Sequence, residues 1–251
     1  MKILEVHELQ CGYGQTGIVS GVSFGVASGE CLGLIGPNGH GKTTILRAIS
    51  GVVPSWAGTI HFDGRLLGRL SPHRIARLGI GHVPQGDMLF SDLTVEDNLA
   101  AALYGTGRWS DRRRLIREVY EVFPRLEERR RQLAVTLSGG EKRMLALGRG
   151  LSMGAKLLMI DEPSLGLAPR VIAEVYDRVR HLHERGLSMI VVEENPMRLR
   201  NIADHLCLID GGRIVESGPT EQMLEHRQVL ETYLGFSGDH ARVGSLGEEN
   251  Q

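Results

Sequence analysis

The chain has 251 residues, of which 41% are hydrophobic, so it is long enough to bury an α/β core without disulfide support. Its 29 basic and 30 acidic residues give a formal net charge of −1, which excludes a global field that attracts nucleic acid or anionic lipid. The three cysteines lack C-x-x-C spacing and suit buried positions in a reducing cytosol better than a disulfide or zinc framework.

The N-terminal stretch predicts strands of an antiparallel sheet. Residues 3–9 and 22–26 alternate between apolar and polar side chains, and Gly12 and Gly14 supply turn residues between them. Tyr13 lies in this turn region, where the residues alone allow either a packing role or a stacking role against a base. No stretch predicts a secretory signal or the roughly 18 apolar residues of a membrane span, so we expect another chain to make any membrane crossing.

A phosphate-binding loop follows the next predicted strand. Residues 36–44 fit the pattern G-x-x-x-x-G-K-[ST], between an apolar strand at 31–35 and a helix over 43–49. An ordinary glycine turn is the alternative, but the complete pattern favours a cradle of backbone N–H groups around the phosphates of ATP. Lys42 is expected to reach the β- and γ-phosphates, and the Thr43 hydroxyl to coordinate Mg²⁺. The predicted nucleotide-binding residues are Gly36, Pro37, Asn38, Gly39, His40, Gly41, Lys42, Thr43 and Thr44.

The middle of the chain changes to helical spacing. A short predicted strand over residues 79–84 delivers Gln85, and apolar side chains then recur at helical intervals over residues 95–103 and 111–126. Two arginine runs, at residues 112–114 and 129–131, have acidic neighbours and few aromatic ones. They favour a solvated helix face over nucleic-acid binding, and we expect no nucleic-acid partner.

Residues 137–141, Leu-Ser-Gly-Gly-Glu, open a further helix that runs through residue 151. Ser138, Gly139 and Gly140 place a hydroxyl and backbone N–H groups at its N-terminus and predict a second anion site. A capped helix without a ligand is the alternative. One chain with one nucleotide does not need two phosphate sites, and the residues alone leave this unexplained.

Two carboxylates end the predicted strand over residues 156–162. Its continuous apolar run suits a central parallel strand, and sites in α/β proteins lie at the carboxyl ends of such strands. We expect Asp161 to hold Mg²⁺ directly or through water, and Glu162 to act as the general base for attack on the γ-phosphorus. A further strand, over residues 187–192, is followed by Glu193, Glu194 and Asn195.

The phosphate loop together with residues 137–141 resembles the ATP-binding cassette family. The resemblance implies an α/β P-loop ATP-binding cassette with a parallel-sheet core, an N-terminal antiparallel β subdomain and a helical subdomain at about residues 87–153. It implies that Tyr13 stacks on adenine and that Gln85 contacts Mg²⁺ and the attacking water. It also implies dimerisation, in which residues 137–141 of each subunit cover the γ-phosphate on the other and residues 163–169 cross the interface.

Two positions depart from this family's pattern. Glu194 stands where most members have a histidine at the γ-phosphate, and His40 stands where a small residue is usual. Like charges at about 4 Å repel by several kcal/mol near a protein surface, so a carboxylate beside a triphosphate needs a proton, Mg²⁺ or a basic neighbour. Without one, Glu194 is expected to turn away, and His40 is expected to be a tolerated side chain at the dimer interface.

Residues 2–236 resemble more narrowly the shorter ATPase of branched-chain amino-acid importers. The resemblance rests on residues 120–129, 137–141, 161–169 and 233–235. It implies an ATPase at the cytoplasmic face of the cell membrane that powers import of branched-chain amino acids or related small polar solutes. The implied partners are transmembrane permease subunits, a second ABC ATPase subunit in a heterodimer or a homodimer, and indirectly a solute-binding protein.

Two other functions stay open beside the importer. One is the ATPase of an exporter of lipid or polysaccharide, and the other is a soluble ABC ATPase without a transport role, which the short insert and the single cassette disfavour. We expect residues 1–236 to form one cassette and residues 237–251 to form a disordered tail, because the tail lacks periodic apolar positions.

Overall fold

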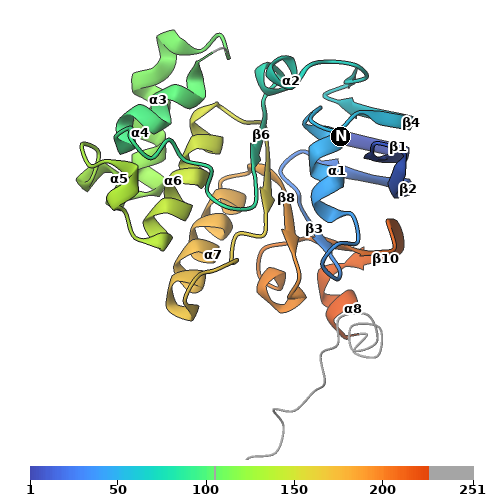
Figure 1. The fold of residues 1–251 in the computed structure, drawn as a ribbon. Helices are drawn as coiled ribbons and strands as arrows, with labels where there is room; N and C mark the ends of the chain where they lie inside the picture. Colours follow the sequence, from blue (N-terminus) through green and yellow to red (C-terminus); the bar gives the residue numbers. More distant parts are fainter. Residues whose placement is uncertain (105, 226–251) are drawn as a thin grey trace, which may run out of the picture.

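A computed structural model describes residues 1–104 and 106–225 of the chain, which form two β-sheets and a group of helices (Figure 1). The expected tail at residues 237–251 and the motif at residues 233–235 lie outside the described residues. No helix within the described ranges is long and apolar enough to cross a membrane. All three cysteines are free and buried, as the sequence predicts.

A six-stranded sheet lies at the centre, with the strand order β10-β9-β3-β8-β7-β6. Strand β10 runs antiparallel to β9, and the other neighbours pair in parallel. Every side chain of β3, β7 and β8 is buried, because both faces of the sheet are covered. The strands are β3 (Cys31–Ile35), β6 (Ile80–Val83), β7 (Leu157–Asp161), β8 (Ser188–Glu193), β9 (His205–Asp210) and β10 (Arg213–Pro219).

An antiparallel sheet with the order β2-β1-β4-β5 covers one face of the central sheet. Its strands are β1 (Lys2–Tyr13), β2 (Thr16–Ala27), β4 (Ser55–Phe62) and β5 (Arg65–Leu66). The predicted antiparallel pairing at the N-terminus is therefore confirmed, although β1 and β2 extend beyond residues 3–9 and 22–26. The chain turns at residues 14 and 15, where Gly14 has a φ of 58°, a value that favours glycine.

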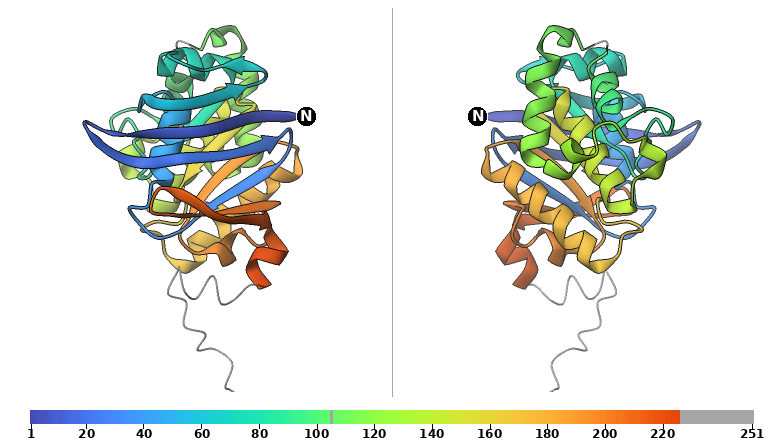
Figure 2. Two further views of the ribbon diagram at one scale, coloured as in Figure 1. Left: turned by 90° about the vertical axis from the view of Figure 1, so that its right-hand side faces the viewer. Right: turned by 90° about the vertical axis from the view of Figure 1, so that its left-hand side faces the viewer.

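The predicted helical part forms a lobe on the side opposite the antiparallel sheet, as Figures 1 and 2 show. Its elements are α3 (Val95–Leu103), η1 (Trp109–Asp111), α4 (Arg112–Val122), α5 (Pro124–Glu128), η2 (Ala134–Thr136) and α6 (Gly139–Ser152). Helical spacing over residues 111–126 predicts one segment, but the structure breaks it at Phe123, whose φ is −125° and ψ 71°. The reason is Pro124, because a proline disfavours the helical conformation of the residue before it.

The remaining helices cover the two faces of the central sheet. They are α1 (Lys42–Ile49), α2 (Pro72–Leu78), α7 (Pro169–Glu184), η3 (Pro196–Leu199) and α8 (Thr220–Glu225). The buried side chains of α1 pack in one hydrophobic cluster with the antiparallel sheet, and those of α6 and α7 pack in a second cluster. Alternate residues of β7 and β8 enter the two clusters, which is the pattern of strands buried on both faces.

Candidate active site

The loops that carry the predicted site residues meet at the carboxyl edge of the central sheet. Ile35 of β3 pairs with Glu193 of β8, and Asp161 of β7 pairs with Val192. Because neighbouring parallel strands end at the same level, the loops after β3, β6, β7 and β8 lie together. The structure thereby gathers four features of the sequence: the phosphate loop (residues 36–41), Gln85, the pair Asp161 and Glu162, and Glu194.

The phosphate loop is a tight turn between β3 and α1. Gly36, Gly39 and Gly41 have φ values of 143°, 82° and 104°, and a Cβ on Gly36 would lie 2.1 Å from the carbonyl oxygen of Ile209. The Lys42 side chain is 4% exposed and donates from Nζ to the carbonyl oxygens of Gly36 at 2.7 Å and Pro37 at 2.8 Å. A small pocket of about 90 Å³ opens here, lined by Asn38, Gly39, Gly41, Lys42, Thr43, Thr44 and Glu162.

Burial lowers the pKa of the Lys42 ammonium, and the nearby carboxylates of Glu162, Glu194 and Asp161 oppose this shift. The loop is thus a cationic site enclosed by acidic neighbours. Its backbone and Lys42 offer donors to an anion, which is the chemistry of a phosphate cradle.

Asp161 and Thr43 face each other across the start of α1. The Thr43 hydroxyl donates to Asp161 Oδ1 at 3.1 Å, and Asp161 is fully buried. Burial raises the pKa of the Asp161 carboxyl, while the hydrogen bond from Thr43 and the charge of Arg47 oppose the shift. The second carboxylate oxygen, Oδ2, is buried and has no hydrogen-bond partner among the described residues.

An unpartnered buried carboxylate oxygen beside a hydroxyl fits a divalent cation. Hard cations such as Mg²⁺ take oxygen ligands, usually one or two from the protein, with the rest from substrate phosphates and water. The residues present therefore fit Mg²⁺ at Thr43 and Asp161, next to the phosphate loop.

Glu162, which follows Asp161 in the chain, is hydrogen-bonded to Gln85. Gln85 Nε2 donates to Glu162 Oε2 at 2.9 Å. The φ of Glu162 is 45°, a left-handed conformation that costs a non-glycine residue about 1–3 kcal/mol and is concentrated at functional sites. Burial raises the pKa of the Glu162 carboxyl, while the charge of Lys42 opposes the shift. A carboxylate with a raised pKa is a stronger base than an ordinary glutamate.

Glu194 does not turn away from the phosphate loop. Its Oε2 accepts from the Asn38 amide at 3.2 Å, so the carboxylate lies against the loop. The expectation that it turns away is therefore wrong in this structure, and the amide donor of Asn38 is the physical reason. His40 lies on the opposite side of the loop, with Nδ1 2.7 Å from Asp210 Oδ1 at the end of β9.

Two predicted parts of the site are separate from this pocket. The Tyr13 side chain is 45% exposed at the end of β1, and its hydroxyl accepts from Arg47 Nη1 at 2.9 Å. Ser138 caps α6: its hydroxyl accepts from the Glu141 N–H at 3.4 Å, and its own N–H donates to Glu141 Oε2 at 3.0 Å. Neither Tyr13 nor the helix start at residues 138–140 lines the pocket at the phosphate loop.

Two buried charged residues were not predicted as site residues from the sequence. Glu193 is 1% exposed and accepts hydrogen bonds from Ser164, Tyr176 and Arg198. Arg143 is 3% exposed and lies behind Asp161 and Glu162. The sequence pattern does indicate that Arg143 is buried. It is spaced by three and four residues from Gly140 and Leu147, so it lies on the apolar face of its helix.

Comparisons with known proteins agree with this geometry. Residues 19–165 match the protein-family model described as ABC transporter. The high-affinity branched-chain amino acid transport ATP-binding protein BraG of Pseudomonas aeruginosa is 39% identical, over 93% of this chain and 100% of that protein. The lipopolysaccharide export system ATP-binding protein LptB of Escherichia coli K12 is 33% identical, over 94% of this chain and 98% of that protein.

Among solved structures, a nucleotide-free ATP-binding cassette from an ABC transporter aligns with a TM-score of 0.83. The alignment covers 94% of this chain and 100% of that chain at 23% sequence identity. This likeness confirms the expected cassette fold.

Proposed function

Because the chain belongs to the family of ABC transporter ATP-binding subunits and is thus a nucleotide-binding ATPase, we propose that it powers an importer of branched-chain amino acids or related small polar solutes. The observation that carries the catalytic part is the meeting of Thr43 with Asp161 and of Gln85 with Glu162 beside the phosphate loop. The importer part is supported by the 39% identity to BraG, which exceeds the 33% identity to LptB.

The site residues divide the work of hydrolysis. Lys42 and the loop N–H groups bind the β- and γ-phosphates. Thr43, Asp161 and Gln85 would hold Mg²⁺, which would supply positive charge against the negative charge of the phosphates. Glu162 accepts the proton of the attacking water, and its raised pKa suits that role. Gln85 orients Glu162 through their hydrogen bond.

The start of α6 serves a second subunit. ATPases of this family act with transmembrane permeases and dimerise. We propose that Ser138, Gly139 and Gly140 bind the γ-phosphate held by the partner ATPase, because they form a capped helix N-terminus that does not line their own chain's pocket. In the same assembly Tyr13 stacks on adenine, and its exposed ring is available for this contact.

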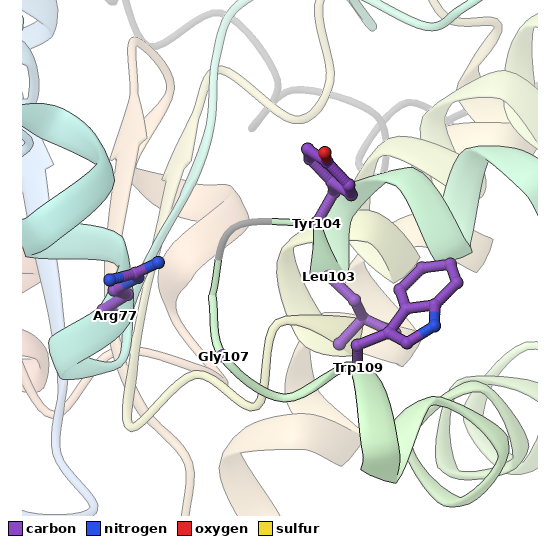
Figure 3. A pocket seen from close by; sticks show the side chains of 5 residues that line it. All are labelled: Arg77, Leu103, Tyr104, Gly107 and Trp109. Carbon is purple, nitrogen blue, oxygen red and sulfur yellow. The ribbon is translucent and has the colours of Figure 1, made fainter.

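The permease binds on the lobe side of the molecule. A pocket of about 520 Å³ between α2 and α3 is lined by Arg77, Leu103, Tyr104, Gly107 and Trp109 (Figure 3). The Tyr104 and Trp109 side chains are 86% and 49% exposed, and aromatic side chains of this kind dominate protein interfaces. We propose that an apolar segment of the permease fills this pocket and also contacts the exposed Met88 and Phe90, at the cytoplasmic face of the membrane.

The direct test is to purify the tagged chain from membranes with its co-purifying permease and reconstitute the complex in vesicles. With a solute-binding protein added, we expect ATP-driven uptake of leucine, isoleucine or valine. Extraction of lipid or lipopolysaccharide without amino-acid uptake would instead assign the chain to an exporter, and a chain that purifies without any membrane subunit would contradict a transport role.

A further inference from the structure

Arg143 of α6 reaches the backbone of two separate loops of the active site. Its guanidinium donates from Nη2 to the carbonyl oxygens of Asp161 at 2.8 Å and Glu162 at 2.5 Å, and from Nε to that of Pro163 at 3.1 Å. From Nη1 it donates to the carbonyl oxygen of Pro84 at 3.3 Å, directly before Gln85. A planar guanidinium with five N–H donors is the side chain that can hold several carbonyl groups in a fixed geometry.

The Gln85 loop (residues 84–90) also contacts α6 through the side chains of two arginines. Arg143 Nη1 lies 3.7 Å from Asp87 Oδ1, and burial raises the pKa of the Asp87 carboxyl while the charge of Arg143 opposes the shift. Six residues further along the helix, Arg149 Nη1 donates to the Met88 carbonyl at 2.6 Å, and its guanidinium lies 4.9 Å from the centre of the Phe90 ring. Met88 has a φ of 42°, so these contacts hold a strained loop.

We propose that Arg143 is a positioning residue for ATP hydrolysis, which holds the strained backbone of Glu162 and the Gln85 loop in one arrangement, with Asp87 as its ionic partner in the loop. Glu162 needs such support, because its φ of 45° persists only where the surroundings fix it. Arg143 thereby fixes the backbone that carries the donor and the backbone that carries the acceptor of the hydrogen bond from Gln85 to the Glu162 carboxylate.

A consequence is that the Gln85 loop, which faces the proposed permease, and the general base Glu162 move together. Met88 and Phe90 are exposed on the loop, while Pro84 and Asp87 of the same loop contact Arg143. A displacement of the loop by a bound permease therefore reaches the carbonyl groups of Asp161 and Glu162 through one guanidinium. This consequence rests on the proposed role of the loop in permease docking, whereas the positioning role itself concerns hydrolysis alone.

The test measures kcat and KM for Mg-ATP with the purified full chain. We expect Arg143→Gln to lower kcat by about ten- to hundredfold, because a misplaced base costs that much, with KM within about threefold. Arg143→Lys keeps the positive charge that faces Asp87 but lacks the several N–H donors of a guanidinium. We expect its kcat to lie between that of Arg143→Gln and that of the wild type. Asp87→Asn should lower kcat several-fold, and the double variant should be no slower than Arg143→Gln alone, since the two residues act as one unit.

Asp92→Asn is the matched control, because Asp92 is an exposed aspartate five positions along the chain, and its kcat should equal that of the wild type. Melting temperatures separate misfolding from mispositioning, and the partly exposed Asp87 offers a variant that folds if Arg143→Gln does not. The proposal is overturned if Asp87→Asn matches Asp92→Asn, if the losses of Arg143→Gln and Asp87→Asn multiply, or if they fall on KM alone. These ratios do not depend on vesicles, so failed amino-acid uptake contradicts the importer proposal and leaves the Arg143 test intact.

Discussion

At the scale of single residues, the site holds charged groups in buried positions, where burial shifts their pKa values. The Asp161 carboxylate keeps a buried, unpartnered oxygen beside the Thr43 hydroxyl, and Glu162 keeps a raised pKa in a strained backbone conformation. Lys42 supplies the positive charge that offsets both carboxylates. Each of these groups would cost stability without the others, which is typical of a site built for function.

Lys42→Ala is expected to abolish ATP hydrolysis and most of the nucleotide affinity, because it removes the buried cation of the phosphate loop. Phosphate release and binding of a fluorescent ATP analogue measure the two effects. Lys156→Ala is the control, since Lys156 is half exposed and pairs with Asp63 on the surface. Unchanged turnover in Lys42→Ala would contradict the assignment of the loop.

Glu162→Gln is expected to leave ATP binding intact, to slow hydrolysis by about a thousandfold or more, and to accumulate an ATP-bound dimer. Gel filtration with ATP detects the dimer, and Glu174→Gln on α7 is the control, because its carboxylate is exposed. A variant that hydrolyses at nearly the parental rate would place the general base elsewhere.

The pH dependence of hydrolysis follows from the raised pKa of Glu162. The base must be ionised to accept a proton, so kcat falls as the pH drops through this pKa, with a midpoint above the ordinary glutamate value of 4.5. Glu194 raises the pKa of Glu162, so Glu194→Gln should move the midpoint to lower pH. A pH–rate profile of both chains measures the shift, and an acid limb centred at or below pH 4.5 would contradict it.

At the scale of secondary-structure elements, α6 connects the parts of the site. Its N-terminus carries the capped Ser138, its second turn carries Arg143 behind Glu162, and Arg149 in its third turn holds the Gln85 loop. A second network, centred on Glu193, joins Ser164 of the loop after β7 to Arg198 of η3. These contacts fix the loops on both sides of the phosphate pocket to rigid elements.

The proposed permease contact is tested by substitution of the aromatic side chains in the pocket between α2 and α3. Tyr104→Ala and Trp109→Ala should each weaken permease binding by about tenfold or more, because exposed aromatic anchors carry much of an interface's energy. Uptake in vesicles should fall while hydrolysis by the purified chain stays at the parental rate. Leu66→Ala on β5 is the control, since Leu66 is 54% exposed and lies in the antiparallel sheet, away from the pocket. Normal uptake by both aromatic variants would show that the permease binds elsewhere.

At the scale of the whole molecule, Glu194 together with the proposed anion site at the start of α6 predicts an asymmetric pair of ATPases. Glu194 lies against the phosphate loop, where its repulsion of a γ-phosphate is on the order of 1 kcal/mol after screening, enough for a several-fold rate effect. The start of α6 keeps its capping box, and no such penalty acts at the partner's nucleotide that we propose it binds. We therefore expect this chain's own phosphate loop to turn over more slowly than its partner's.

Substituting the phosphate-loop lysine of each subunit separately, with ATP hydrolysis as the readout, measures this asymmetry. Lys42→Ala in this chain should reduce total hydrolysis less than the equivalent change in the partner, and Glu194→His should raise the slower rate. Equal losses together with an unchanged rate in Glu194→His would show that the asymmetry does not exist.

The sequence by itself determined the strand, loop and helix around the phosphate site, because glycines with positive φ and a buried lysine are local requirements that residue types reveal directly. It also determined the carboxylates at the carboxyl end of β7 and the cap of α6, since strand ends and helix caps carry local patterns. The position of Glu194 against Asn38 and the contacts of Arg143 were decided only by the tertiary structure. They join residues far apart in the chain, and parallel strand register and helix packing, rather than sequence spacing, bring such residues together.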